Sequence, residues 1–90
     1  MNLDTYVGLR EDIFVEIQNN CFVLNKKTEN SKDTLLYLTK INAIILATFD
    51  GVTTLQEISS ILSEIVEINE SESVKLLEKA VNLYTCYMII

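Results

Sequence analysis

The sequence predicts an α+β fold in which a three-stranded antiparallel sheet is followed by three helices, and three observations support this prediction. Before residue 39, apolar and polar residues alternate in short segments, as they do in half-buried strands. After residue 39, apolar residues recur at intervals of three and four, as on the buried face of an amphipathic helix. Turn and capping residues stand between these segments. The 90 residues are expected to form one domain, residues 1–90, with a core from about residue 12 to about residue 84.

The strand segments are separated by residues that favour turns. Residues 13–18 alternate with period 2 and form the first expected strand. The pair Asn19 and Asn20 suits a tight hairpin turn, because asparagine tolerates positive φ, and residues 21–24 would return antiparallel. The polar stretch 25–32 is expected to be a solvated loop.

The third expected strand covers residues 34–38. Alternation places Leu36 and Leu38 on one face, and Leu35 and Tyr37 on the other. Residues 6–9 are a further candidate for an extended segment.

The first two helices have recognisable ends. Thr39 is expected to cap the first helix, and Asp50 with Gly51 to end it, because glycine readily takes the left-handed conformation found at helix C-termini. Thr54 and Glu57 have the spacing of a capping box at the start of the second helix. The expected apolar faces are Ile41, Ile44, Ile45 and Phe49 on the first helix, and Leu55, Ile58, Ile61, Leu62 and Ile65 on the second.

The third helix has an unusually wide apolar surface. Ser71 or Ser73 is expected to cap it, and it runs to about residue 83 or 84. A helix that packs on a single core needs a narrower apolar stripe than this one has. The second apolar flank therefore needs its own contact, either with more of this protein or with a bound partner. Residues 84–90 leave the helix pattern and are expected to be either a final short strand or the place where a longer parent enzyme was cut. The two apolar flanks are Val74, Leu77, Val81 and Tyr84, and Leu76, Ala80 and Leu83.

The acidic balance of the chain argues against nucleic acids and anionic membranes as partners. Thirteen acidic and seven basic residues give a net charge of −6, whereas binding to phosphates depends on Lys and Arg. No apolar run approaches the roughly 18 residues of a membrane helix, and no signal peptide pattern is present. A cytoplasmic location is therefore expected.

No catalysis, cofactor or metal is expected. Histidine, the commonest general base and metal ligand, is absent. The serines of the second helix have no His or Lys partner at a convincing spacing, and the glutamates near the last turn form no calcium-loop pattern. Cys21 and Cys86 make no zinc set and are expected to be buried, reduced thiols, with a disulfide bridge between them as the alternative.

Four features occur in a distinctive order between residue 21 and about residue 83. They are a hairpin whose strand ends at Leu38-Thr39, a helix ending Phe49-Asp50-Gly51, the segment Thr54-Leu55-Gln56-Glu57-Ile58, and a final apolar-striped helix. This order resembles the PqqD-like family, whose members recognise precursor peptides in the biosynthesis of ribosomally made, post-translationally modified peptides. The chain departs from the family after Leu83, where members often have an Arg-Gly-Leu-like turn and this sequence has no glycine.

The resemblance implies a winged-helix-like fold that does not bind DNA. It also implies that the leader segment of a precursor peptide adds as an extra strand to the sheet, in the groove between the third strand and the last helix. A modifying enzyme, such as a radical SAM or cyclising enzyme, would act on the peptide in trans or as a fused domain. The implied peptide-binding residues are Thr34, Leu35, Leu36, Tyr37 and Leu38 on the strand, and Leu76, Lys79, Ala80 and Leu83 on the helix.

Two other functions remain open from the residues. A winged-helix transcription regulator would share the helix count, but the second helix carries no Arg or Lys with which to contact DNA. A protein adaptor would use the same groove without any precursor peptide. For each apolar residue of the third helix, a place in the core also competes with a place in the groove, because the core is the commoner location of such residues.

Overall fold

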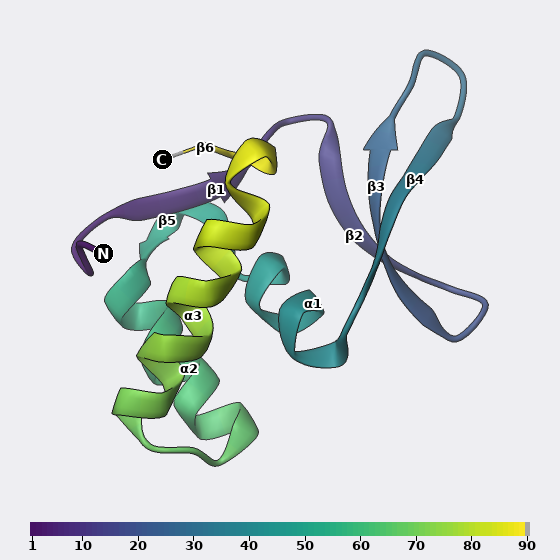
Figure 1. Cartoon of the computed structure of the whole chain (residues 1–90). Coiled ribbons are helices and arrows are strands. Elements are labelled where there is room, and N and C mark those ends of the chain that lie inside the picture. Colours follow the sequence, from purple (N-terminus) through teal and green to yellow (C-terminus); the bar gives the residue numbers. More distant parts are fainter. Residues whose placement is uncertain (90) are drawn as a thin grey trace.

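Four strands precede the first helix in the computed structural model, which describes residues 1–89 (Figure 1). The fold is α+β, with two three-stranded antiparallel sheets and three α-helices in this described part. The elements are β1 (Tyr6–Leu9), β2 (Ile13–Gln18), β3 (Cys21–Lys27), β4 (Lys32–Leu38), α1 (Lys40–Ala47), β5 (Asp50–Thr54), α2 (Leu55–Val66), α3 (Glu70–Tyr84), the 3₁₀ turn η1 (Thr85–Tyr87) and β6 (Met88–Ile89).

The predicted hairpin turn between β2 and β3 is confirmed. Asn19 and Asn20 have φ angles of 52° and 65°, which is the left-handed conformation that a two-residue hairpin turn requires. The predicted polar loop over residues 25–32 is present only at residues 28–31, because β3 continues to Lys27 and β4 begins at Lys32. Strand β3 is central, and its pairing with β2 and β4 keeps its polar end extended: Lys26 lies between Ile13 and Asp33.

A bulge in β4 changes which side chains face the core. Leu36 pairs with Leu24 and Thr34 pairs with Asn25, so Leu35 is one residue more than β3 matches. Simple alternation would place Leu35 and Leu36 on opposite faces, but both pack against the core, as does Leu38. The predicted alternation is therefore wrong at Leu35.

The second sheet has the order β5-β1-β6 and joins distant parts of the chain. Tyr6 pairs with Thr54, and Gly8 pairs with Ile89. Residues 6–9 are thus a strand, as predicted. Met88 and Ile89 form the short strand β6, and Ile90 lies outside the described residues. The predicted order of one sheet followed by three helices is not met, because β5 lies between α1 and α2 and β6 follows α3.

The prediction that Asp50 and Gly51 end the first helix is wrong. Helix α1 ends at Ala47, and the Thr48 amide donates to the carbonyl of Ile45. Asp50 and Gly51 instead begin β5, where Gly51 has a φ of 81°. The Asp50 carboxylate accepts hydrogen bonds from the amides of Val52 and Thr53, each over 2.9 Å, and this makes the turn.

Two of the predicted helix caps are confirmed, and one is wrong. The Thr39 hydroxyl accepts from the Asn42 amide at the start of α1. Thr54 and Glu57 form both bonds of the capping box of α2. Helix α3 begins earlier than predicted, because the Asn69 side chain accepts from the Glu72 amide over 2.8 Å.

The serines predicted to cap the third helix both lie inside it. Ser73 is buried, and its hydroxyl donates to the carbonyl of Ser59 on α2. Two predicted core residues of α2 are exposed: Ile61 is 39% exposed and Ile65 is 57% exposed. Cys21 and Cys86, predicted to be buried, are free and exposed.

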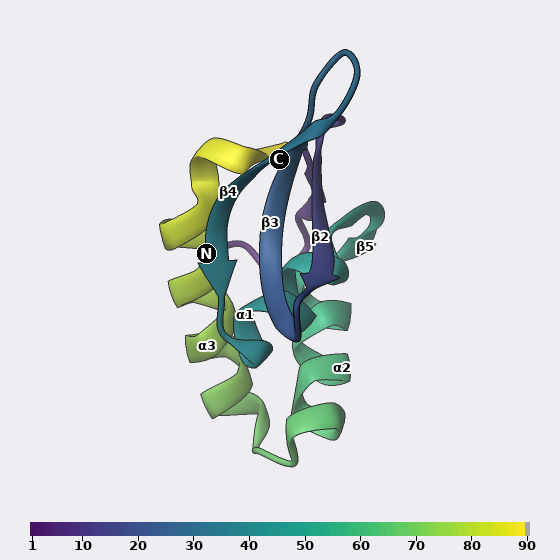
Figure 2. The ribbon, with the colours of Figure 1, turned by 90° about the vertical axis from the view of Figure 1, so that its right-hand side faces the viewer.

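The helices pack behind the β2-β3-β4 sheet, as Figure 2 shows, with β4 on the side of α3 and β2 on the side of α2. Helix α1 contacts β2, β3 and both other helices. The fully buried side chains of the core come from every layer and include Val7, Leu24, Leu46, Ile58 and Leu77. None of the helices within residues 1–89 has the length and apolar character needed to cross a membrane.

Candidate functional site

A hollow of about 440 Å³ lies between the start of α1 and the middle of α3. It is open to the surface and is lined by both apolar side chains and lysines. We call it the α1–α3 groove. Its lining residues are Thr39, Lys40, Ile41 and Asn42 from the start of α1, and Leu76, Lys79, Ala80 and Leu83 from α3.

The apolar residues of α3 occupy different depths in the α1–α3 groove. Leu83 is 60% exposed and lies at the rim, and Leu76 is half-buried. Ala80 is only 1% exposed, so its methyl group forms part of the floor and also packs in the core. Groove and core are therefore not alternatives at Ala80, because this side chain separates the two.

Hydrogen bonds fix the α1 side of the groove. The Asn42 amide is held by the Thr39 hydroxyl over 3.2 Å, as part of the helix cap. The Asn42 side-chain Nδ2 donates to the hydroxyl of Tyr84 over 3.0 Å, and Tyr84 is buried in α3. Because Tyr84 belongs to the same helix as Leu83, this bond ties the two walls together.

The groove is locally basic although the chain is acidic. Lys40 and Lys79 are both exposed, and one stands on each helix. Within residues 1–89, no carboxylate oxygen lies within 4.0 Å of either lysine. By contrast, Lys26 is bridged to Asp12, and Lys32 to Glu16.

The N-terminus of α1 adds to the positive potential of the groove. Aligned peptide dipoles give a helix N-terminus about half a positive charge. The first turns of α2 and α3 carry acidic side chains that offset this charge, whereas the first turn of α1 carries none.

Strand β4 has an open edge beside the groove. In the described residues it pairs with β3 on one side only, so the backbone groups along its other edge are not used by the sheet. Its last residue, Leu38, is followed directly by Thr39, which lines the groove. A peptide extending β2-β3-β4 by one strand would therefore run toward the α1–α3 groove.

The predicted site residues fall into two groups. The four on α3, Leu76, Lys79, Ala80 and Leu83, are brought together in one hollow. The five on β4, Thr34 to Leu38, form the adjacent open edge and do not line the hollow; Thr34 and Tyr37 are exposed, and Tyr37 is 76% exposed. Sequence reasoning missed the α1 residues from Lys40 to Asn42. Their position could have indicated them, because they directly follow the predicted strand and the Thr39 cap and so begin the helix beside the strand.

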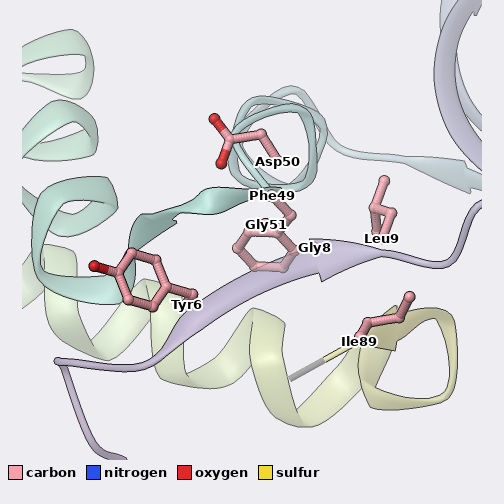
Figure 3. Close-up of a pocket in the computed structure, with 7 residues that line it drawn as sticks. All are labelled: Tyr6, Gly8, Leu9, Phe49, Asp50, Gly51 and Ile89. Atoms are coloured by element: carbon pink, nitrogen blue, oxygen red, sulfur yellow. The ribbon is translucent and has the colours of Figure 1, made fainter.

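A second hollow lies over the β5-β1-β6 sheet and is drawn in Figure 3. Its residues include Tyr6, Phe49, Asp50 and Ile89. The amide of Val52 and the hydroxyl and amide of Thr53 lower the pKa of Asp50 below its ordinary value of 3.8, so this carboxylate is a turn element and is poorly suited to accept a proton. Within residues 1–89, no group of three or more His, Cys, Asp or Glu side chains is placed to hold a metal ion.

Comparisons with protein-family models, with curated proteins and with solved structures found no match to this chain. The α1–α3 groove and the open edge of β4 are therefore the features from which we infer a function.

Proposed function

We propose that this chain captures the leader segment of a ribosomally made precursor peptide and delivers it to a partner modifying enzyme. The leader would add as an antiparallel or parallel strand to the open edge of β4 and place a side chain in the α1–α3 groove. In this proposal the fold is a winged-helix-like one, and the chain itself does no chemistry.

The observation that carries the proposal is the continuity of β4 with the groove. Strand addition obtains affinity from backbone hydrogen bonds and specificity from pockets that receive alternate side chains. Both parts are adjacent here, because the open edge ends at Leu38 and the groove begins at Thr39. Leu36 and Leu38 are only half-buried, so a bound strand would cover more of their apolar surface.

The exposure of Leu83 gives the proposal a second support. A large apolar side chain that is 60% exposed at the rim of a hollow gains from a partner that removes it from water. We expect a Kd of about a micromolar or tighter, because ordering a flexible peptide offsets part of the contact energy.

Recognition of DNA through α2 is the weaker alternative. Helix α2 has no Lys or Arg, and its Ser59 is buried and bonded to Glu70 and Ser73. A side chain used in this way is not free to contact a base edge.

The test is titration of labelled protein with synthetic leader segments of short precursor peptides encoded beside radical SAM or cyclising enzymes, followed by amide NMR shifts. We expect the first shifts in β4, at the start of α1 and in α3. Shifts confined to α2 would contradict the proposal. Binding of a folded partner protein at the same residues, with no response to any leader segment, would favour the adaptor function.

A matched pair of variants makes this test sharper. Leu83 and Ile65 are similarly exposed, at 60% and 57%, but only Leu83 lines the groove. Leu83→Asp is expected to weaken leader binding about tenfold or more, whereas Ile65→Asp should leave it unchanged. Equal binding by the two variants would remove the groove from the proposal.

A further inference from the structure

We infer that the peptide captured at this site carries an Asp or Glu within one or two residues of the aliphatic side chain that enters the α1–α3 groove. This inference rests on the proposed function, and it specifies the chemistry of the peptide.

The apolar part of the groove selects an aliphatic side chain. Ile41, Leu76 and Leu83 surround the floor made by Ala80. The small methyl group of Ala80 leaves room for a branched residue such as Leu, Ile or Val, and burial of such a side chain is favourable in proportion to the apolar area removed from water.

The charged part selects an acidic neighbour. The chain has only seven basic residues and a net charge of −6, yet two of its lysines, Lys40 and Lys79, line this one hollow from different helices. Neither lysine has a carboxylate within 4.0 Å among residues 1–89. An acidic side chain on the peptide would form charge-assisted hydrogen bonds with ammonium groups that the folded chain leaves free.

The placement of acidic residues on α3 agrees with this assignment. Glu78 lies near the N-terminal ammonium group of Met1, at 3.9 Å, in the hollow lined by Thr5 and Asn82. The Glu72 carboxylate accepts from the side-chain Nδ2 of Asn69 over 3.4 Å at the start of the helix. Both carboxylates are therefore used away from the groove, and the N-terminus of α1 adds a partial positive charge within it.

The experiment is a specificity switch, and its probe is a displayed library of random peptides of about twelve residues, enough to cover one added strand. The library is selected in parallel against the natural chain, a Lys40→Glu/Lys79→Glu variant and a Lys75→Glu variant. Lys75 lies one turn before Lys79 on α3 and does not line the groove, so Lys75→Glu controls for the general change in charge. All three proteins are checked for folding by thermal unfolding before selection.

We expect the natural chain and the Lys75→Glu variant to enrich an aliphatic residue with Asp or Glu nearby. The double variant should keep the aliphatic preference and replace the acidic residue with Lys or Arg. For one selected peptide, changing its acidic residue to the corresponding amide should weaken binding to the natural chain about twofold to fivefold, less so at high salt.

The possible failures are distinguishable. Selected peptides that shift the amide NMR signals of β4 and α3 show binding at the proposed site. If such peptides have no acidic preference, or if the preference does not change in the double variant, the inference is wrong and the proposed function stands. If the Lys75→Glu variant loses the acidic preference as fully as the double variant, the selection reflects the overall electrostatic potential of the chain. The inferred direct contact of the peptide carboxylate with Lys40 and Lys79 is then wrong. If no selected peptide binds at β4 and α3, the proposed function itself fails.

Discussion

The side chain of Asn42 donates a hydrogen bond from Nδ2 to the hydroxyl of Tyr84 over 3.0 Å, and this joins the start of α1 to the end of α3. Asn42 lines the α1–α3 groove, whereas Tyr84 is only 5% exposed and packs in the core. The bond therefore connects the position of a groove wall to the packing of the core.

Tyr84→Phe tests this connection. The substitution keeps the buried ring and removes the acceptor of Asn42, so we expect the free energy of unfolding to fall by about 1 kcal/mol. Peptide binding should weaken as well, because Asn42 is then held only through its backbone. Denaturant unfolding and peptide titration measure the two effects. Tyr6→Phe is the control, since Tyr6 is 57% exposed on β1 and does not line the groove; equal losses of stability in both variants would argue against a role for the Asn42 bond.

Two substitutions on α3 should separate the floor of the groove from its rim. Ala80→Glu would bury an unpaired carboxylate at a site that is 1% exposed, so we expect a loss of about 3 kcal/mol or more, enough to unfold a marginally stable domain. Leu83→Asp, at a site that is 60% exposed, should change stability by less than about 1 kcal/mol. Chemical denaturation or a thermal melt measures the stability of both variants. A stable Ala80→Glu variant would mean that this side chain can turn outward into the groove.

Sequence reasoning succeeded where a structure depends on neighbouring residues. The Asn19-Asn20 turn, the Thr39 cap and the Thr54–Glu57 capping box each follow from local chemistry, and all three are present. Four residues of the predicted site line one hollow, because Leu76, Ala80 and Leu83 share one flank of a single helix and Lys79 directly precedes Ala80.

Sequence reasoning failed where a structure depends on distant pairing. Asp50 and Gly51 have the composition of a helix end, but pairing with β1 makes them the start of a strand. The bulge at Leu35 depends on the register with β3, and no local pattern encodes that register. Ile65 was placed in the core because its helical period is correct, but it is 57% exposed among the described residues.

The turn at Asp50 should make stability depend on pH in the acid range. The hydrogen bond from the Val52 amide, followed by those from Thr53, lowers the pKa of Asp50 below 3.8. A carboxylate whose pKa is lower in the folded state contributes stability above its unfolded pKa, and that contribution is lost as pH falls through the folded pKa. Asp50→Asn should therefore be less stable than the natural chain near neutral pH, with the difference closing below about pH 4.

Thermal melting of both proteins from about pH 6 to about pH 2.5 measures this effect. Asp33→Asn is the control, because Asp33 is exposed on β4 and its side chain accepts no hydrogen bond from residues 1–89. A difference between the natural chain and Asp50→Asn that stays constant across this range would contradict the role assigned to the Asp50 charge.

Backbone methylation of a bound peptide tests strand addition most directly. Along an added strand, successive peptide N–H groups point alternately toward β4 and away from it. Methylating two N–H groups that point toward β4 removes their hydrogen bonds and introduces steric clashes, so binding should weaken at least about tenfold. Methylating the two intervening groups, which face away from the open edge, should leave the Kd within about threefold.

The two methylated peptides have the same composition, charge and added apolar surface, so they control for each other. A groove that only captured side chains would bind them equally, because the aliphatic and acidic groups are unchanged. A helical ligand in the α1–α3 groove would lose affinity with either peptide, since every internal N–H of a helix is used in its own hydrogen bonds. Only a strand added to the edge of a sheet gives a large effect at one parity and a small effect at the other, and isothermal titration of both peptides distinguishes the three cases.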